Sequence, residues 1–280
     1  MTPDFQEIES LTECPGCKNP EIQITVVPDI AKCSSCQLFF RNPRPTQREI
    51  ARSYDTGGTF DAWQEEEAAR AAMWTRRLEV IRRHAPGGRL LDVGTGDGRF
   101  LATAQEGGYE VTGTEVSEAG ATYARERGFE VHLGQIVDLD LPAGSFDVAT
   151  IWHVLEHVPD PGAVLRKVHS LLRPGGILGV AVPNEENFFL RERFGQGKSS
   201  PFAPLQFGGE IHLTYFRPAT FRSTLRAADF EVQEFGVDDI YHVRDLKMRV
   251  KLPVQQALAR AFNWHFAVAM YAVCQRREHP

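Results

Sequence analysis

The stretch RLLDVGTGDGRFL, at residues 89–101, places an acid and three closely spaced glycines between a strand pattern and a helical pattern. Glycine lets a backbone approach a ligand where any side chain would collide with it. The next strand pattern ends in Glu115, where doubly wound folds place a carboxylate that binds ribose hydroxyl groups. The spacing predicts a crevice for a ribose-bearing cofactor, and its expected contacts are Asp92, Gly94, Gly96, Gly98 and Glu115.

The spacing of the glycines separates two kinds of cofactor. A nicotinamide dinucleotide fingerprint reads G-x-G-x-x-G and holds pyrophosphate on the following helix. This chain reads G-x-G-x-G, and Arg99 stands where the third glycine of the fingerprint belongs. With Asp92 ahead of its first glycine, the loop resembles motif I of class I S-adenosylmethionine-dependent methyltransferases, whose cofactor has no phosphate. A structural glycine turn in another kind of α/β protein is the alternative.

Four cysteines near the N-terminus form two C-x-x-C pairs, Cys14 with Cys17 and Cys33 with Cys36. Two such pairs at this separation are typical of structural zinc, because four thiolates close a tetrahedron and leave no open position. The segment EIQITVV between the pairs alternates as a hairpin strand does. We therefore predict a zinc ribbon that needs its metal to fold. A redox dithiol is disfavoured, because two pairs are present and no βαβ unit surrounds either.

Further segments extend the resemblance over most of the chain. Residues 144–178 resemble the motif IV region of small-molecule methyltransferases, including the ubiquinone-biosynthesis O-methyltransferases, and residues 212–230 resemble a C-terminal segment of the same group. The stretch CSSCQLFFRNPRPT resembles the ribbon lead-in of some bacterial methyltransferases of surface-glycan and natural-product pathways. The resemblance implies a seven-stranded fold, methyl transfer, and adenine contacts from Gln135 and Ile136, although relatives often carry an acid at the position of Gln135.

Three histidines are candidate general bases for a hydroxyl acceptor, because imidazole titrates near neutral pH. His153 follows the fourth strand pattern, close to the expected place of the methyl group, and is also a candidate cofactor contact. His212 precedes the C-terminal segment, His157 lies near His153, and Tyr215 is a weaker candidate. Packing or helix capping is the alternative role for each side chain.

Residues 153–157, HVLEH, also match the H-x-x-E-H signature of a metallopeptidase. On a helix the two histidines would share a face and could bind a metal ion. The match falls between a strand pattern and a helix capped at Asp160, which disfavours a peptidase. A second interpretation is that Glu156 and His157 hold a divalent ion that helps to ionise an acceptor hydroxyl. The ubiquinone-type relatives carry a glutamate at the position of His153, which weakens this interpretation.

Strand and helix patterns alternate through the chain, which predicts a Rossmann-like, mostly parallel seven-stranded sheet with helices on both faces. Expected strands cover residues 90–93, 109–114, 129–133, 146–151, 177–182 and 266–274. Expected helices cover residues 65–84, 99–106, 118–127, 161–172 and 249–262, with helix then strand over 221–237. The helix at 161–172 is the best marked, with Asp160 as its cap, Pro161 in the first position and Pro174-Gly175-Gly176 behind it.

Three parts are expected along the chain: a zinc ribbon at residues 1–45, a linker and helical lead-in at 46–86, and a class I methyltransferase domain at 87–280. Within the last, residues 184–216 are long for a loop and carry several phenylalanines among glycines and prolines. Such segments commonly cover a substrate. A packed helical insertion is the alternative.

Composition limits the function further. The chain has 280 residues, a net charge of −6 and 42% apolar residues, as an ordinary soluble globular protein has. Its acidity fits nucleic acid poorly, and Pro183-Asn184-Glu185 does not match the amide-nitrogen motif of ribosomal-RNA methyltransferases that also carry zinc ribbons. No apolar run approaches membrane-spanning length and no signal-peptide core is present, so the expected location is the cytoplasm.

Together these patterns predict an S-adenosylmethionine-dependent enzyme with structural zinc that methylates an oxygen of a small hydroxylated molecule or a glycan precursor. Transfer to nitrogen or carbon in a natural-product or sugar pathway stays open, as does the oligomeric state. A non-catalytic sensor or scaffold that binds S-adenosylmethionine and docks a partner through its ribbon is the rival from a different class.

Overall fold

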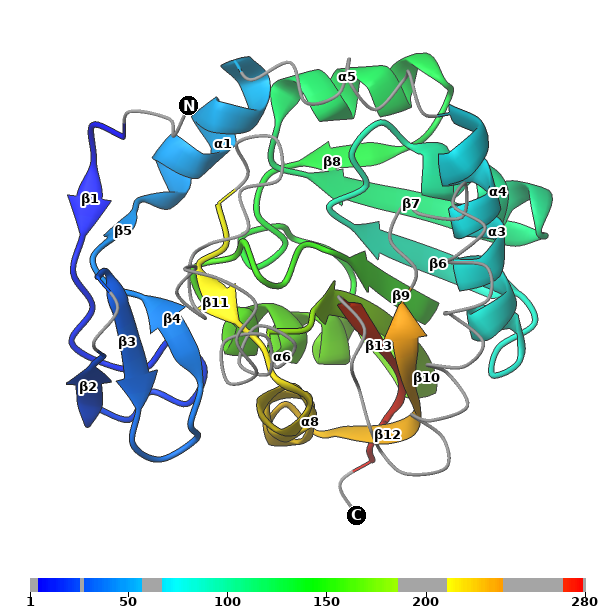
Figure 1. Cartoon of the computed structure of the whole chain (residues 1–280). Coiled ribbons are helices and arrows are strands. Elements are labelled where there is room, and N and C mark those ends of the chain that lie inside the picture. The colour runs from blue at the N-terminus through cyan, green and yellow to red at the C-terminus, as the bar shows by residue number, and fades with distance from the viewer. Residues whose placement is uncertain (1–4, 26–27, 57–66, 186–210, 239–268, 279–280) are drawn as a thin grey trace.

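The computed structural model describes residues 5–25, 28–56, 67–185, 211–238 and 269–278 (Figure 1). A seven-stranded sheet runs through it in the order β12-β13-β10-β9-β6-β7-β8. Its strands are β6 (Gly88–Val93), β7 (Tyr109–Glu115), β8 (Val131–Leu133), β9 (Phe146–Trp152), β10 (Leu172–Pro183), β12 (Phe230–Asp238) and β13 (Ala269–Arg276). Only the pairings of β13 are antiparallel among these strands, which confirms the predicted mostly parallel sheet.

Helices cover both faces of this sheet. They are α3 (Glu67–Arg82), α4 (Arg99–Glu106), α5 (Glu118–Glu126), α6 (Pro161–Leu171) and α8 (Pro218–Ala227). Side chains alternate along a strand, so Leu90 of β6 packs with residues of α3 and α4, and its neighbour Leu91 joins the cluster that contains residues of α6 and α8. The predicted three-layer α/β architecture is therefore confirmed.

The helix α6 shows how closely local signals set an element. The Asp160 side chain accepts a hydrogen bond from the Ala163 backbone nitrogen at 2.8 Å, and Pro161 takes the first helical position. The C-terminal end of α6 differs from the prediction. The helix ends at Leu171, and β10 already begins at Leu172 and runs through Pro174-Gly175-Gly176. A register irregularity between Leu172 and Ile177 lets the strand pass through these turn-forming residues.

The N-terminal ribbon is a four-stranded sheet in the order β11-β4-β3-β2. Its strands are β2 (Ile22–Ile24), β3 (Ile30–Cys33), β4 (Phe39–Arg41) and β11 (Thr214–Tyr215). The strand β11 comes from far along the chain, and Figure 1 shows it in yellow beside the blue β4. Leu38 and Phe40 of the ribbon also share an apolar cluster with Leu165 of α6. Ribbon and α/β part thus share a strand and a core.

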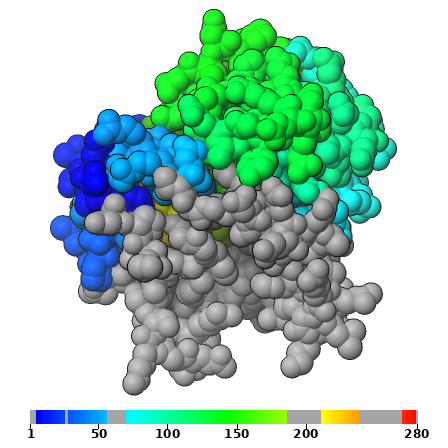
Figure 2. All heavy atoms as spheres, turned by 90° about the horizontal axis from the view of Figure 1, so that it is seen from above, coloured from blue at the N-terminus to red at the C-terminus, as the bar shows by residue number. Residues whose placement is uncertain are grey.

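The lead-in connects the ribbon to the side of the seven-stranded sheet that ends in β8. A short pairing of β1 (Ile8–Glu9) with β5 (Arg44–Pro45) precedes α1 (Gln47–Thr56). The Ser117 hydroxyl before α5 donates a hydrogen bond to Asp55 of α1 at 2.6 Å. In Figure 2, atoms of α1 in lighter blue lie beside the green atoms of the α/β part. The expected helix at 249–262 and most of the expected cover at 184–216 lie outside the described residues.

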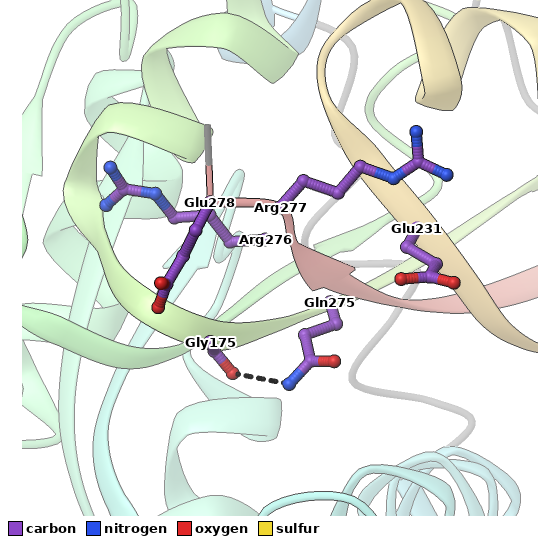
Figure 3. Close-up of a pocket in the computed structure, with 6 residues that line it drawn as sticks. All are labelled: Gly175, Glu231, Gln275, Arg276, Arg277 and Glu278. Atoms are coloured by element: carbon purple, nitrogen blue, oxygen red, sulfur yellow. Dashed lines mark hydrogen bonds between the residues drawn. The ribbon is translucent and has the colours of Figure 1, made fainter. Parts of the chain in front are cut away.

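A surface hollow of about 390 Å³ lies at the start of β10 and the end of β13, with Gly175, Glu231 and Gln275 among its lining residues (Figure 3). The Gln275 side-chain amide donates to the Gly175 carbonyl across its floor at 3.3 Å. This edge is opposite to the carboxyl ends of the parallel strands, where open α/β sheets bind ligands. Within the described part of the chain, no helix has the length and apolar character needed to cross a bilayer.

Candidate active site

The glycine loop connects β6 to α4 and turns on three left-handed residues. Gly94, Gly96 and Gly98 have φ angles of 73°, 55° and 78°, a region that side chains disfavour. A Cβ atom on Gly94 would lie 2.4 Å from Cγ2 of Val154. The loop therefore packs directly against the turn between β9 and α6.

Glu115 ends β7 and ties the glycine loop to that strand. Its Oε2 accepts from the Gly96 nitrogen at 2.8 Å, and its Oε1 accepts from the backbone nitrogens of Val116 and Ser117 at 2.7 and 3.0 Å. Burial raises the pKa of Glu115, and the three backbone donors only partly offset this effect. A carboxylate this deeply set at a strand end can hold neutral hydroxyl groups without further desolvation.

Two further acids fix the loop. Asp92 at the end of β6 accepts from the Thr150 hydroxyl at 2.6 Å, and burial raises the pKa of Asp92 to about 7. Asp97 in the loop accepts two hydrogen bonds from Arg70 of α3, at 2.7 and 2.9 Å, and both side chains are 2% exposed. Sequence reasoning missed Arg70, because one arginine on a helix carries no signal of its partner.

Gln135 and Ile136, the predicted adenine contacts, lie next to the end of β7. The Gly134 nitrogen donates to the Glu115 carbonyl at 2.8 Å, which brings the segment after β8 alongside Glu115. Ile136 is buried and Gln135 is half-buried. The structure therefore brings these two residues together with the glycine loop and Glu115 at one edge of the sheet.

His153 opens the turn after β9 and is held between two carboxylates. Its φ angle is +56°, its Nε2 lies 2.8 Å from Oδ2 of Asp238, and its Nδ1 lies 3.4 Å from Oε1 of Glu156. Residues 153–157 form a turn and not a helix, so the helical face that a metallopeptidase requires is not formed. Asp238 was missed by sequence reasoning because it lies far along the chain, at the end of β12.

The electrostatics of this group favour a charged imidazole. Arg77 of α3 donates two hydrogen bonds to Asp238, at 3.1 and 2.5 Å, and these two side chains are 5% exposed. Burial disfavours ionised Asp238, but Arg77 and His153 outweigh it and lower the pKa of that carboxyl. Burial likewise disfavours protonated His153, but Asp238 and Glu156 outweigh it and raise the pKa of the imidazole. The geometry therefore fits His153 as a cation rather than as a proton acceptor.

This pairing predicts a specific dependence of stability on pH. The raised pKa of His153 means that its stabilisation is complete below its ordinary value of 6.5 and is lost as pH rises through the raised pKa. The lowered pKa of Asp238 means that its stabilisation is present above its ordinary value of 3.8 and is lost at lower pH. We expect Asp238→Asn to lower the free energy of unfolding by about 2 kcal/mol near pH 6. The free energy of unfolding of Asp238→Asn should also decline less steeply above pH 6.5 than that of the wild type.

Urea unfolding between about pH 5.5 and pH 8.5 measures both effects. The control is Glu130→Gln, because Glu130 is 68% exposed and its nearest described histidine, His132, is 35% exposed. Parallel stability curves for Asp238→Asn and the wild type above pH 6.5 would show that His153 does not titrate against Asp238.

A second cluster lies on the other side of Glu156. Potential ligand atoms of Glu156, His157 and His212 lie within 4.8 Å of one another, and all three residues are buried. The His157 Nδ1 donates to the Ile211 carbonyl at 2.8 Å, and its ring stacks edge-to-face on His212 with centroids 4.9 Å apart. Oε1 of Glu185 lies 3.9 Å from Nδ1 of His212. The structure thus brings together His157 and His212, two of the three candidate bases.

Glu156 is the shared member of both clusters. Burial disfavours its charged form, but His153, His157 and His212 outweigh burial and lower the pKa of Glu156. Its Oε2 has no hydrogen-bond partner among the described residues although the side chain is 1% exposed. A buried carboxylate oxygen of this kind is suited to an acceptor hydroxyl or a metal ion. Tyr215 is less suited to act as a base, because burial raises its pKa to about 12.

The four ribbon cysteines converge as predicted. Sulfur atoms of Cys14 and Cys36, and of Cys17 and Cys33, lie 3.6 Å apart, and all four lie within 4.8 Å of one another. Zinc–sulfur bonds of about 2.3 Å in a tetrahedron place sulfurs about 3.8 Å apart. The Cys36 nitrogen also points to the Cys33 sulfur at 3.4 Å. The donor set and its spacing fit a zinc ion.

Known proteins give the same fold and family. A family model described as a methyltransferase domain matches residues 63–234. The ubiquinone biosynthesis O-methyltransferase of Nitrosococcus oceani is 35% identical over 167 residues, 56% of this chain and 70% of that protein. The fold is also similar to the structure of 1,6-didemethyltoxoflavin-N1-methyltransferase from Burkholderia thailandensis with bound 1,6-didemethyltoxoflavin and S-adenosylhomocysteine. The match covers 92% of this chain and all of that protein, with a TM-score of 0.57 and 20% identity.

Likeness of fold alone leaves the reaction open. The cyclase SpnF is similar at a TM-score of 0.51 and 22% identity, over 73% of this chain and 81% of its own. The family match is stronger evidence, because it spans more than half of the chain and includes the glycine loop, Glu115 and the turn after β9. The chain therefore belongs to the class I S-adenosylmethionine-dependent methyltransferases, with S-adenosylmethionine as its methyl donor.

Proposed function

We propose that this methyltransferase acts on an oxygen of a small hydroxylated molecule or a glycan precursor. The observation that carries the proposal is the buried group of Glu156, His157 and His212. Glu156 and His157 belong to the turn after β9, and Val154 of the same turn packs against Gly94 of the glycine loop. A hydroxyl must lose its proton as it is methylated, and this cluster offers proton acceptors in a water-poor place. The O-methyltransferase named among the relatives supports attack by oxygen.

The cofactor has a defined place in this proposal. Glu115 would hold the two ribose hydroxyls, the backbone of the glycine loop would hold the methionyl group, and Gln135 and Ile136 would hold the adenine. When bound, S-adenosylmethionine supplies an electrophilic methyl carbon on a sulfonium. The burial of Glu115 and the left-handed glycines support this arrangement, because they set a carboxylate and a backbone without side chains next to each other where β6 and β7 end.

His212 is the proposed general base, with His157 as its neighbour. His153 is already bound by Asp238 and Glu156, and these carboxylates outweigh burial and raise the pKa of its imidazole, which favours the protonated form. As the acceptor oxygen bonds to the methyl carbon and the carbon–sulfur bond breaks, the hydroxyl proton passes to His212. Glu156 stabilises the positive charge that then forms on the imidazole ring.

Turnover with a panel of acceptors tests this function. The full chain is incubated with S-adenosylmethionine and phenols, catechols, methyl glycosides or amines, and S-adenosylhomocysteine and the methylated product are detected by mass spectrometry. We expect product from a hydroxylated class. Product from amines alone would show that nitrogen and not oxygen is the attacking atom of the acceptor. Tight cofactor binding without product from any class would favour a sensor or scaffold. Parallel assays with EDTA and with added Mg²⁺ show whether a divalent ion at Glu156 and His157 takes part.

The ribbon is proposed to hold one structural zinc ion through Cys14, Cys17, Cys33 and Cys36. Such thiolate sites are typical of a reducing compartment such as the cytoplasm. We expect one zinc per chain by elemental analysis and four zinc–sulfur distances of about 2.3 Å by X-ray absorption. The Cys274→Ser variant is the control, because Cys274 is buried in β13 and outside the cluster. Paired disulfides and no metal would overturn the proposal.

A further inference from the structure

The segment that carries His212 is a strand of the ribbon sheet. Thr214 and Tyr215 of β11 pair antiparallel with Phe40 and Phe39 of β4. The Arg41 nitrogen extends this pairing by donating to the Leu213 carbonyl at 2.8 Å. The residue that follows His212 is therefore hydrogen-bonded to the ribbon.

The other side of the same segment is bonded to the active-site turn. The nitrogens of Leu213 and Thr214 donate to the Glu156 carbonyl at 2.7 and 3.0 Å. The Ile211 carbonyl accepts from His157, as described above. Leu213 thus uses its carbonyl toward the ribbon and its nitrogen toward Glu156, so residues 211–215 form a bridge between the two.

The ribbon end of this bridge depends on the cysteine cluster. Cys33 closes β3, which pairs with β4, and the Cys33 nitrogen donates to the Leu38 carbonyl at 3.0 Å. The ribbon also docks on the start of α6, where Lys18 pairs with Asp160 at 2.6 Å and Arg44 donates to the Pro159 carbonyl at 2.8 Å. A module of this size relies on its metal for a fixed shape.

We infer that the metal-bound ribbon positions the active site: β4 holds β11, and β11 holds His212 against His157 and Glu156. This rests on the proposed function, in which His212 is the base. His212 precedes β11, which pairs with β4, and β4 pairs with β3, which ends at Cys33 of the four-cysteine cluster, so the ribbon is a working part of the methyl-transfer site. The Arg41–Leu213 hydrogen bond is the connection that can be cut without touching a cysteine or a histidine.

The test compares Arg41→Pro with Arg41→Ala. Proline removes the nitrogen–hydrogen donor that bonds Leu213, whereas alanine removes the same side chain and keeps the donor. Successive residues of a strand bond to opposite neighbours, so Phe40 still pairs with Ala31 of β3 in both variants. In the proline variant we expect amide exchange of residues 211–216 to rise at least about tenfold. We also expect a changed His212 titration in NMR spectra of ¹³C-labelled histidine, assigned with His212→Gln.

S-Adenosylmethionine affinity and zinc content should stay within about twofold of wild type in both variants, because the glycine loop and the cysteines are unchanged. A second arm removes zinc from the full chain with a chelator and restores it, and exchange of residues 211–216 should rise and then recover. This arm still decides the question if the proline variant fails to fold. Equal exchange and equal His212 titration in the proline variant, the alanine variant and the metal-free chain would overturn the inference. A His212→Gln variant with full turnover would instead refute the proposed base and leave the exchange result standing.

Discussion

Replacing Glu115 with alanine should weaken S-adenosylmethionine binding at least about 100-fold, measured by calorimetry. The carboxylate already accepts three backbone hydrogen bonds, and the proposed complex adds two ribose hydroxyls. Hydrogen bonds to a charged group contribute about 1.5–3 kcal/mol each, and about 1.4 kcal/mol corresponds to a tenfold change in affinity. Alanine also leaves the Gly96 nitrogen without this acceptor, so the glycine loop loses its tie to β7.

The control for this change is Glu130→Ala. Glu130 precedes β8 and is 68% exposed, so its loss removes a carboxylate from the amino end of the neighbouring strand, away from Glu115 and the glycine loop. The S-adenosylmethionine affinity of Glu115→Gln should fall between those of Glu115→Ala and Glu130→Ala, because an amide keeps the shape of the side chain and loses its charge. Unchanged affinity in Glu115→Ala, with an unchanged thermal midpoint, would contradict the assignment of the ribose site.

Patterns local in sequence predicted the strand, loop and helix elements at the carboxyl edge of the sheet. The glycine loop, the carboxylate that ends β7 and the cap of α6 each follow from a few adjacent residue types with one favourable backbone conformation. The predicted strands agree with β6, β7 and β9 to within two residues at each end, because buried parallel strands are short apolar runs between turn residues. The predicted strand at 129–133 was shorter in the structure, because only Val131–Leu133 pairs with β7.

Partners distant in sequence could not be predicted. Asp238 lies 161 residues from Arg77 and 85 from His153, and no local pattern marks an acid at a strand end as the partner of either. The sequence therefore left His153 and His212 equal as bases. The ion pair with Asp238 and the left-handed backbone of His153 now distinguish them.

The connection between the ribbon and the active site could not be predicted from the sequence either. The strand β11 is two residues long and too short for any periodicity, so its pairing with β4 depends on the folded chain alone. The predicted division after residue 45 treats the ribbon as a separate part, whereas the sheet and the apolar cluster cross that division. Short strands completed by a distant segment lie beyond what composition and alternation can indicate.

Replacing His212 with glutamine should lower kcat for a hydroxylated acceptor about 1,000-fold and leave S-adenosylmethionine affinity within about twofold. General-base catalysis contributes roughly 100- to 10,000-fold, and glutamine keeps a polar side chain without a basic nitrogen. The pH dependence should change as well, because protonation of His212 inactivates the wild type at low pH. That acidic limb should be missing from the residual activity of the variant. Stopped assays across pH 5.5–9 with the acceptor found in the panel measure both effects.

Two matched changes separate a base from a metal ligand or a packing residue. His132→Gln alters a histidine that is 35% exposed on β8 and should keep full activity. His157→Gln removes the ring that packs on His212 and should reduce kcat less than His212→Gln does, because the proton acceptor remains. If His212 instead binds a divalent ion with Glu156 and His157, raised Mg²⁺ or Mn²⁺ should restore much of the activity of His212→Gln. A missing base cannot be restored in this way, so rescue by metal would refute the general-base role and assign the cluster to a cation.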